Sequence, residues 1–195
     1  MTFGNLGEMV VLTLRSPDRA LALLRRLDLG AAERWMVVVL AASLSSLLAG
    51  LARQLVPVPA DDPLALLTAH PLTLAGLQLG AMVVSAVAVT VIGRAFGGRG
   101  AFADALVLVA WIELILVGLQ TVQLVLMLLV PPLAPIMSVF ALAVSIYLTI
   151  ALTKALHGFT STVLVVLGFV GGVFILATIM SVIAVALGLL PEVSP

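Results

Sequence analysis

The apolar residues of this chain run in five long blocks, and each block is separated from the next by a short stretch rich in proline, glycine or charge. About 20 mainly apolar residues are enough for a helix to cross the hydrocarbon core of a bilayer. Every block reaches that length, and the prolines and glycines between the blocks break helices. We therefore predict five membrane-spanning helices, at about residues 35–56, 72–92, 102–130, 136–155 and 163–190.

The segment before the first block has a different pattern. In "SPDRALALLRRLDLG", Ser16 suits a helix N-cap, Pro17 suits the first helical position, and Gly30 is well placed to end the helix. Four apolar residues share one face of this helix and three arginines lie largely off it: Ala20, Leu23, Leu24 and Leu27, and Arg19, Arg25 and Arg26. This arrangement is typical of an amphipathic helix at a membrane surface, with the arginines near anionic headgroups.

The preceding "LGEMVVLTLR" is expected to form a second, less regular piece of the same kind. We therefore predict a cytoplasmic amphipathic interfacial segment over residues 1–30 and a five-helix transmembrane domain over residues 31–195. The segment has two interpretations. It is either a curvature-sensing or partner-docking surface, or an anchor that lies on the membrane or packs under the bundle.

Composition places the chain in a membrane rather than in water. Apolar residues make up 63% of it and charged residues 9%, against about 45–50% and about 25% in soluble domains. There are no cysteines, which excludes disulfides, thiolate metal sites and a cysteine nucleophile. The fold class that we predict is all-α, with five transmembrane helices preceded by the amphipathic helix.

The basic residues are distributed unevenly about the predicted spans. Most fall on one side of the membrane: Arg15, Arg19, Arg25, Arg26, Arg34, Arg94, Arg99 and Lys154. Only Arg53 falls on the other side, which also holds Asp61, Asp62 and Glu192. Short loops rich in lysine and arginine stay in the cytoplasm, so we predict a cytoplasmic N-terminus and an external C-terminus. The preference for arginine over lysine, with frequent alanine, glycine and proline, favours a bacterial inner membrane.

Glu113 is the single charged residue of the block "VLVAWIELILVGLQTVQLVLMLLV". It lies about 15–18 Å into its helix at 1.5 Å per residue, near mid-membrane. An ionised carboxylate is costly there, so Glu113 should face the bundle, protonated or paired, with Tyr147 or a nearby hydroxyl as its partner. The candidate intramembrane polar site consists of Glu113, Gln78, Gln120, Gln123, Tyr147 and Thr149. It serves either as interhelical hydrogen bonding that fixes helix register, or as a proton or ion relay or a groove for a lipid headgroup.

Two glycine pairs have the spacing that lets membrane helices approach closely, Gly76 with Gly80 and Gly168 with Gly172. We predict that they lie at contacts within the bundle, and a dimer face is the alternative.

The connection "GRAFGGRGAFAD" joins the second and third spans on the predicted cytoplasmic side. A glycine turn that leads into a helix N-terminus can hold a phosphate. Arg94 and Arg99 could assist, and Lys154 and His157 lie at the same level, so one interpretation is an anionic headgroup site. The other is a tight turn in which a loop arginine pairs with Asp104.

No pattern in the chain favours catalysis. His70 and His157 are expected on opposite sides of the membrane, so they cannot share a metal ion. The adjacent Asp61 and Asp62 are typical of a solvated turn. We predict no enzyme activity, no metal, no cofactor and no nucleic-acid partner.

Three stretches, "GRAFGGRGAFADALVLVAW", "PPLAP" and "LHGFTSTVLVVLGFVGG", resemble the Yip family of Ypt/Rab-interacting membrane proteins in their order and spacing. The resemblance covers most of the chain from about Ser16 onward. It implies a five-helix membrane domain with a cytoplasmic N-terminus. In eukaryotes the family is associated with Rab GTPases, vesicle trafficking and the shape of ER and Golgi membranes.

Two function classes follow from these observations. The first is a non-catalytic membrane-organising or adaptor protein, trafficking-like or lipid-associated. Its expected partners are anionic phospholipid on the cytoplasmic side and a membrane or cytoplasmic protein, and it would act as a monomer or an oligomer. The alternative is a small transporter or lipid-translocating protein that uses a polar groove around Glu113. The apolar run "ALVLVAWI" between Asp104 and Glu113 favours the first class, because it interrupts any polar path.

Overall fold

The computed structural model describes residues 3–55 and 70–186, which contain helices and no strand. Two N-terminal helices precede five long ones, and a short 3₁₀ helix comes before the fourth of these. Their bounds are α1 (Phe3–Arg15), α2 (Pro17–Arg26), α3 (Ala31–Leu55), α5 (Pro71–Ala95), α6 (Phe102–Leu129), η1 (Pro131–Leu133), α7 (Ala134–His157) and α8 (Thr162–Ala186). All five long helices are apolar and long enough to cross a membrane. The predicted fold class is therefore confirmed.

Part of the sequence lies outside the described residues. Asp61, Asp62 and Glu192 belong to it, as do position 56 of the predicted first span and positions 187–190 of the predicted fifth span. The other predicted span boundaries agree with the observed helices to within a few residues. This agreement has a physical cause, since a backbone in hydrocarbon must satisfy its own hydrogen bonds and so stays helical across the whole apolar block.

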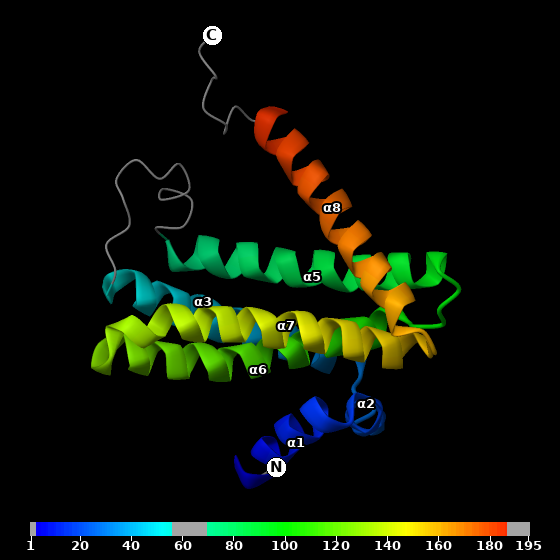
Figure 1. Ribbon diagram of the computed structural model, residues 1–195, viewed down its shortest axis with the longest axis horizontal. Helices are drawn as coiled ribbons and strands as arrows, with labels where there is room; N and C mark the ends of the chain where they lie inside the picture. The colour runs from blue at the N-terminus through cyan, green and yellow to red at the C-terminus, as the bar shows by residue number, and fades with distance from the viewer. Residues whose placement is uncertain (1–2, 56–69, 187–195) are drawn as a thin grey trace.

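The four helices α3, α5, α6 and α7 run side by side in alternating directions (Figure 1). We call one end of this bundle the basic end, because α5 joins α6 and α7 joins α8 there, and Arg94, Arg99 and Lys154 lie in or beside those connections. The central helix is α6, which contacts α3, α5, α7 and α2. It supplies much of the core, including the fully buried Leu108 and Ala110.

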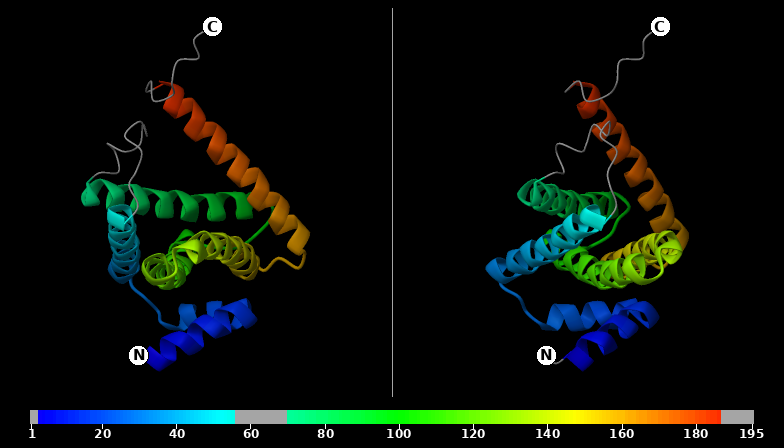
Figure 2. Two further views of the ribbon diagram at one scale, coloured as in Figure 1. Left: turned by 60° about the vertical axis from the view of Figure 1, so that its left-hand side comes forward. Right: turned by 90° about the vertical axis from the view of Figure 1, so that its left-hand side faces the viewer.

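The last helix, α8, leaves the bundle at an angle (Figures 1 and 2). It contacts α5 and α7, and its close contacts lie early in the helix. Gly172 lies so near α5 that an added Cβ would come within 2.6 Å of Cδ1 of Ile92. Farther along, Phe174 is 73% exposed and Met180 is also exposed. Beyond its contact with Ile92, α8 therefore diverges from the bundle (Figures 1 and 2).

The N-terminal segment is more regular than the sequence suggested. Both α1 and α2 are α-helices, and we call them the N-terminal helix pair (Phe3–Arg26). The pair packs along one side of the bundle, with α2 against α7 and α6 (Figure 2). The bundle buries Ala20, Leu21 and Leu24 of α2, whereas Leu23 and Leu27 of the predicted apolar face are exposed. The face that packs on the bundle is therefore rotated from the predicted apolar face and shares Ala20 and Leu24 with it.

Several helix ends follow capping rules. Gly158 ends α7 in the left-handed conformation with φ +70°, and the N–H of Phe159 donates to the Lys154 carbonyl at 3.0 Å, as in the common glycine C-cap. Before α3, the N–H of Gly30 donates to Oε2 of Glu33 at 2.6 Å, half of a capping box. Gly30 therefore precedes α3 rather than directly ending α2. Ser16 occupies the N-cap of α2, but its side chain makes no capping hydrogen bond.

Candidate functional site

A buried polar group lies at the basic end, around His157. The ring is 4% exposed. Its Nδ1 accepts a hydrogen bond from the N–H of Gly100 at 3.1 Å, and its Nε2 lies 3.0 Å from the Val89 carbonyl. A carbonyl can only accept, so Nε2 carries the proton and His157 is neutral in this arrangement. The ring also stacks on Phe159, with centroids 5.4 Å apart.

Three glycines enclose this ring, and we call them the glycine cage (Gly93, Gly98 and Gly100). An added Cβ on Gly93 would lie 2.6 Å from Cδ2 of His157 and closer still to Nε2. A Cβ added at Gly98 would lie 2.6 Å from Cγ of His157 and closer still to Nδ1, and one added at Gly100 would lie 2.7 Å from Cε1. No side chain larger than hydrogen fits at these three positions while the ring stays in place. The cage fastens the α5–α6 connection to the end of α7.

His157, a candidate for the anionic headgroup site, has both ring nitrogens bonded to the backbone inside the protein, so neither is available to a headgroup. The expected pair of Asp104 with a loop arginine is wrong. Its Oδ2 lies 3.0 Å from a terminal nitrogen of Arg25 on α2, and the Arg25 Nε donates to the same oxygen at 3.0 Å. The tight turn itself is present, with Gly97 at φ +84°.

The remaining cations of the basic end are accessible. Arg94 is exposed and donates from Nε to the Gly100 carbonyl at 3.0 Å. Lys154 donates from Nζ to the Thr162 hydroxyl at 2.8 Å, which joins the end of α7 to the start of α8. Arg99 is exposed in the α5–α6 connection. These groups give this end of the bundle a positive surface.

The N-terminal helix pair is held to the bundle by specific hydrogen bonds. Trp111 of α6 donates from Nε1 to the Thr13 hydroxyl at 3.0 Å, and that hydroxyl donates to the Met9 carbonyl at 2.7 Å. Tyr147 of α7 donates its hydroxyl proton to the Leu14 carbonyl at 2.7 Å. The Leu14 carbonyl lies in the last turn of α1, where carbonyl groups have no N–H donor within the helix. Two spanning helices thus hold the end of α1.

At mid-membrane, Glu113 is 9% exposed, so its predicted burial is confirmed. The predicted partner is wrong. The amide Nε2 of Gln78 on α5 donates to Oε1 of Glu113 at 2.7 Å, whereas Tyr147 bonds to α1. Trp111 and Glu113 are two residues apart, hence about 200° apart around α6, so one faces α1 and the other faces α5.

The other members of the expected polar site are dispersed. Gln120 lies 3.4 Å from Ser45 of α3, and Gln123 donates to Ser138 of α7 at 2.8 Å. Thr149 faces a separate space between α5, α7 and α8. The structure therefore places one bonded pair, Gln78 with Glu113, where the sequence suggested a six-residue cluster.

The two glycine pairs differ in their surroundings. Gly168 and Gly172 of α8 lie against α5, close to Ile92. For Gly76 and Gly80 the expected contact is wrong within the described part of the chain, because a Cβ added at either position meets nothing within 4 Å. The spacing of small residues marks a helix face but does not say what covers it.

The family model of the Yip1 domain matches residues 11–183. The chain belongs to the Yip1 family. The match begins within α1 and ends within α8, so the helix contacts and the glycine cage described above lie inside the Yip1 domain. Searches of curated proteins and of solved structures give no match.

Sequence reasoning missed the cage and the contacts of the N-terminal helix pair, although this Yip1 domain carries one signal for each. A tight turn needs one glycine with positive φ, and "GRAFGGRG" has four glycines, so the others indicate a close approach by another group. The signal for the N-terminal contacts was the presence of Trp111 and Tyr147 inside apolar spans. Their N–H and O–H groups need a partner when they are buried in a membrane protein.

Proposed function

We propose that this Yip1-family protein is a non-catalytic membrane-organising protein of the bacterial inner membrane. The observation that carries the proposal is the attachment of the N-terminal helix pair to one side of the bundle. Trp111 and Tyr147 bind α1, and Asp104 binds α2. A rigidly attached pair changes the cross-section of the protein, whereas a loosely tethered one would not.

The depth of these contacts supports an effect on one leaflet. Trp111 is nine residues from the start of α6 at Phe102, and Tyr147 is ten residues from the end of α7 at His157. At 1.5 Å per residue, both lie about 14–15 Å from the basic end, which is about half of a 30 Å hydrocarbon core. In Figure 1, α2 lies beside the half of the bundle nearer the basic end, and α1 runs from there toward the middle of the bundle. The pair therefore adds most of its width to the half nearer the basic end.

The outward surface of the pair fits lipid. Val11, Leu23 and Leu27 are apolar and exposed, and Arg19 and Arg26 are exposed on α2. Apolar residues beside arginines are typical of helices that lie among headgroups and upper acyl chains, where binding depends on curvature and on anionic lipid.

The charge distribution supports the orientation. The basic end carries Arg94, Arg99 and Lys154, and the N-terminal helix pair adds further arginines beside it. Segments rich in lysine and arginine are retained in the cytoplasm. We therefore place the basic end and the N-terminus in the cytoplasm and the C-terminus outside, so that the widened half lies in the cytoplasmic leaflet.

The test is a measurement of how the purified full-length protein distributes among vesicles of different diameter. The vesicles contain phosphatidylethanolamine and phosphatidylglycerol, and the protein is inserted with its basic end outward. We expect enrichment on small vesicles, because a protein wider in the outer leaflet fits positive curvature. Deletion of Met1–Arg26 should leave the bundle inserted and remove the enrichment.

Point variants that keep the N-terminal helix pair but remove its hydrogen bonds to the bundle test whether the attachment itself is needed. Combining Thr13→Val, Trp111→Phe and Tyr147→Phe removes the bonds to α1 and should weaken the enrichment. Thr121→Val is the matched control, because the Thr121 hydroxyl bonds only within its own helix. Equal distribution of the deletion variant and the intact protein would refute the membrane-organising role. Loss of a cross-linked cytoplasmic protein on deletion, with vesicle distribution unchanged, would favour an adaptor role instead.

A further inference from the structure

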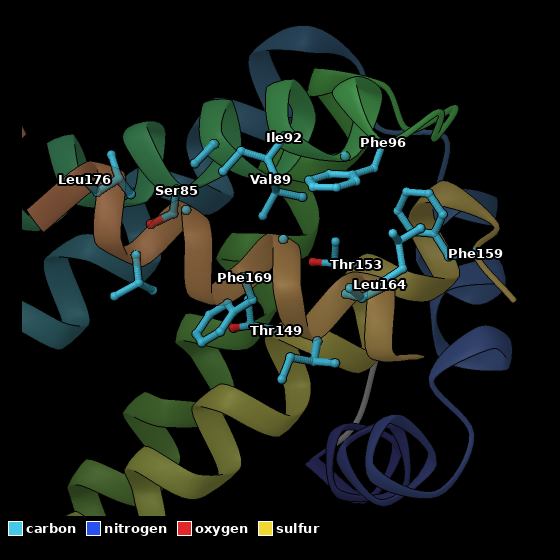
Figure 3. A pocket seen from close by; sticks show the side chains of 17 residues that line it. Ser85, Val89, Ile92, Phe96, Thr149, Thr153, Phe159, Leu164, Phe169 and Leu176 are labelled. Carbon is cyan, nitrogen blue, oxygen red and sulfur yellow. The ribbon is translucent and has the colours of Figure 1, made fainter. Parts of the chain in front are cut away.

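A cavity of about 170 Å³ lies between α5, α7 and α8. Figure 3 shows Phe96 and Phe159 at one end of it, near the basic end of the bundle, and Ser85 and Leu176 at the other. Apart from three hydroxyl groups, its lining consists of apolar side chains and glycines. The cavity extends between these two ends alongside α5, and we call it the α8 groove.

The divergence of α8 creates this groove. Gly172 lets Ile92 approach closely. Because α8 leaves the bundle at an angle (Figure 2), the residues after that contact lie farther from α5, and Phe174 and Ile175 are exposed. Because these helices are built to span a bilayer, the medium beside the groove at this depth is lipid chains rather than water.

One hydroxyl in the groove has no partner. Thr153 Oγ1 is buried and makes no hydrogen bond, the single such side-chain atom among the described residues. The other two hydroxyls are bonded within their own helices, Ser85 to the Ala81 carbonyl and Thr149 to the Ser145 carbonyl, both at 2.8 Å. A threonine hydroxyl has one proton to donate, and in an apolar place it requires an acceptor. Thr153 thus indicates a ligand that carries a carbonyl or similar oxygen.

The depth of Thr153 matches the ester groups of a phospholipid. It lies four residues before the end of α7 at His157, about 6 Å from the basic end at 1.5 Å per residue. The 24 residues of α7 extend about 36 Å, about 6 Å more than a 30 Å hydrocarbon core. If the excess is shared between the two ends, Thr153 lies about 3 Å inside the edge of the core. The ester groups that join acyl chains to glycerol lie at this boundary.

The mouth of the groove carries positive charge. Lys154 follows Thr153, and its bond to Thr162 uses one of three ammonium protons. Arg94 and Arg99 lie at the same end, and the connections at 96–101 and 158–161 contain no acidic residue. An anionic phosphate would be attracted there.

We propose that the α8 groove binds one anionic glycerophospholipid. An acyl chain lies along the groove from Phe159 to Leu176, its ester carbonyl accepts a hydrogen bond from Thr153, and its phosphate lies near Lys154. The inference requires only that the five helices span a membrane. It is independent of the membrane-organising role, since none of these residues belongs to the N-terminal helix pair.

Native mass spectrometry of the delipidated full-length protein tests the site. Dioleoyl phosphatidylglycerol and dioleoyl phosphatidylcholine, which share acyl chains, are titrated separately. We expect one tightly bound phosphatidylglycerol. Lys154→Gln should weaken phosphatidylglycerol binding about fivefold and affect phosphatidylcholine little. Thr153→Val should weaken both about fivefold, because it removes one hydrogen bond. Ala88→Phe, which fills the groove, should abolish tight binding.

Each variant has a matched control outside the groove. Arg53→Gln removes a charge on α3 at the end of the bundle opposite the basic end, Thr178→Val removes a hydroxyl bonded within its own helix, and Val87→Phe adds a ring at an exposed position of α5. All three should bind phosphatidylglycerol as the unmodified protein does. If Ala88→Phe binds as tightly as Val87→Phe, the proposal is wrong.

A second measurement needs no variant, so it remains decisive if Ala88→Phe fails to fold. Phosphatidylglycerol with a photoreactive diazirine in mid-chain is cross-linked to the unmodified protein in vesicles. Labelling concentrated at Phe169 and Leu176 supports the proposal. Labelling spread evenly over the lipid-facing helices, or cross-links that join α8 of one copy to the groove of another, would overturn it.

Discussion

The glycine cage yields the prediction with the best-defined magnitude. Gly93 lies within α5 and is buried against His157. In Gly93→Ala the added Cβ would overlap the imidazole, so the ring must move. Its movement breaks two hydrogen bonds, from Gly100 and to Val89. These contribute about 2 kcal/mol together, and forcing a methyl group into a packed site costs about 1–3 kcal/mol more.

Alanine is also a better helix former than glycine, and this offsets about 1 kcal/mol of the destabilisation. The free energy of unfolding is therefore expected to fall by about 2–4 kcal/mol. In a chain of this length each kcal/mol lowers Tm by about 2–4 °C, so Gly93→Ala should lower Tm by about 5–15 °C. The assay is thermal unfolding in a mild detergent, followed by circular dichroism and by size-exclusion chromatography of the heated samples.

Gly80→Ala is the matched control because Gly80 lies in the same helix and an added Cβ there meets nothing within 4 Å. It should melt at or slightly above the temperature of the unmodified protein. A double-mutant cycle identifies the ring as the cause. In a His157→Ala background the overlap is gone, so Gly93→Ala should cost little. The reasoning is refuted if Gly93→Ala melts at the same temperature as Gly80→Ala. It is also refuted if Gly93→Ala lowers Tm by the same amount with and without His157, because the cage would then not stabilise the basic end.

Two further predictions concern the mid-membrane pair and the topology. Glu113→Gln keeps the shape and a hydrogen-bonding group beside Gln78, so stability should stay near normal, whereas Glu113→Leu and Gln78→Leu should each cost about 1 kcal/mol in thermal unfolding. Proton-coupled transport in proteoliposomes that Glu113→Gln abolishes without unfolding the protein would instead support the transporter alternative. Reporter fusions after Gly98 and Gly158 should read as cytoplasmic and those after Ala60 and Pro195 as external. A cytoplasmic signal at the C-terminus would contradict the proposed orientation.

The sequence by itself determined the number of long helices, their boundaries and the preceding helical segment. Each of these depends on a local requirement. A span must be apolar over a fixed length and must satisfy its own backbone, and proline and glycine end it. The break between α7 and α8 at Gly158 is an example, since the residues around it were enough to place it.

Only the tertiary structure decided which way each helix faces and what it contacts. A helix that is apolar on all sides gives no periodic signal of its orientation, and one residue changes direction by about 100°. The burial of Glu113 was therefore predicted correctly, but its hydrogen-bond partner was predicted to be Tyr147 and is Gln78. The same holds for the cage, where Gly93 and His157 are distant in sequence and meet only because α5 and α7 end side by side. Packing of the whole bundle fixes these rotations, so no single stretch of sequence contains them.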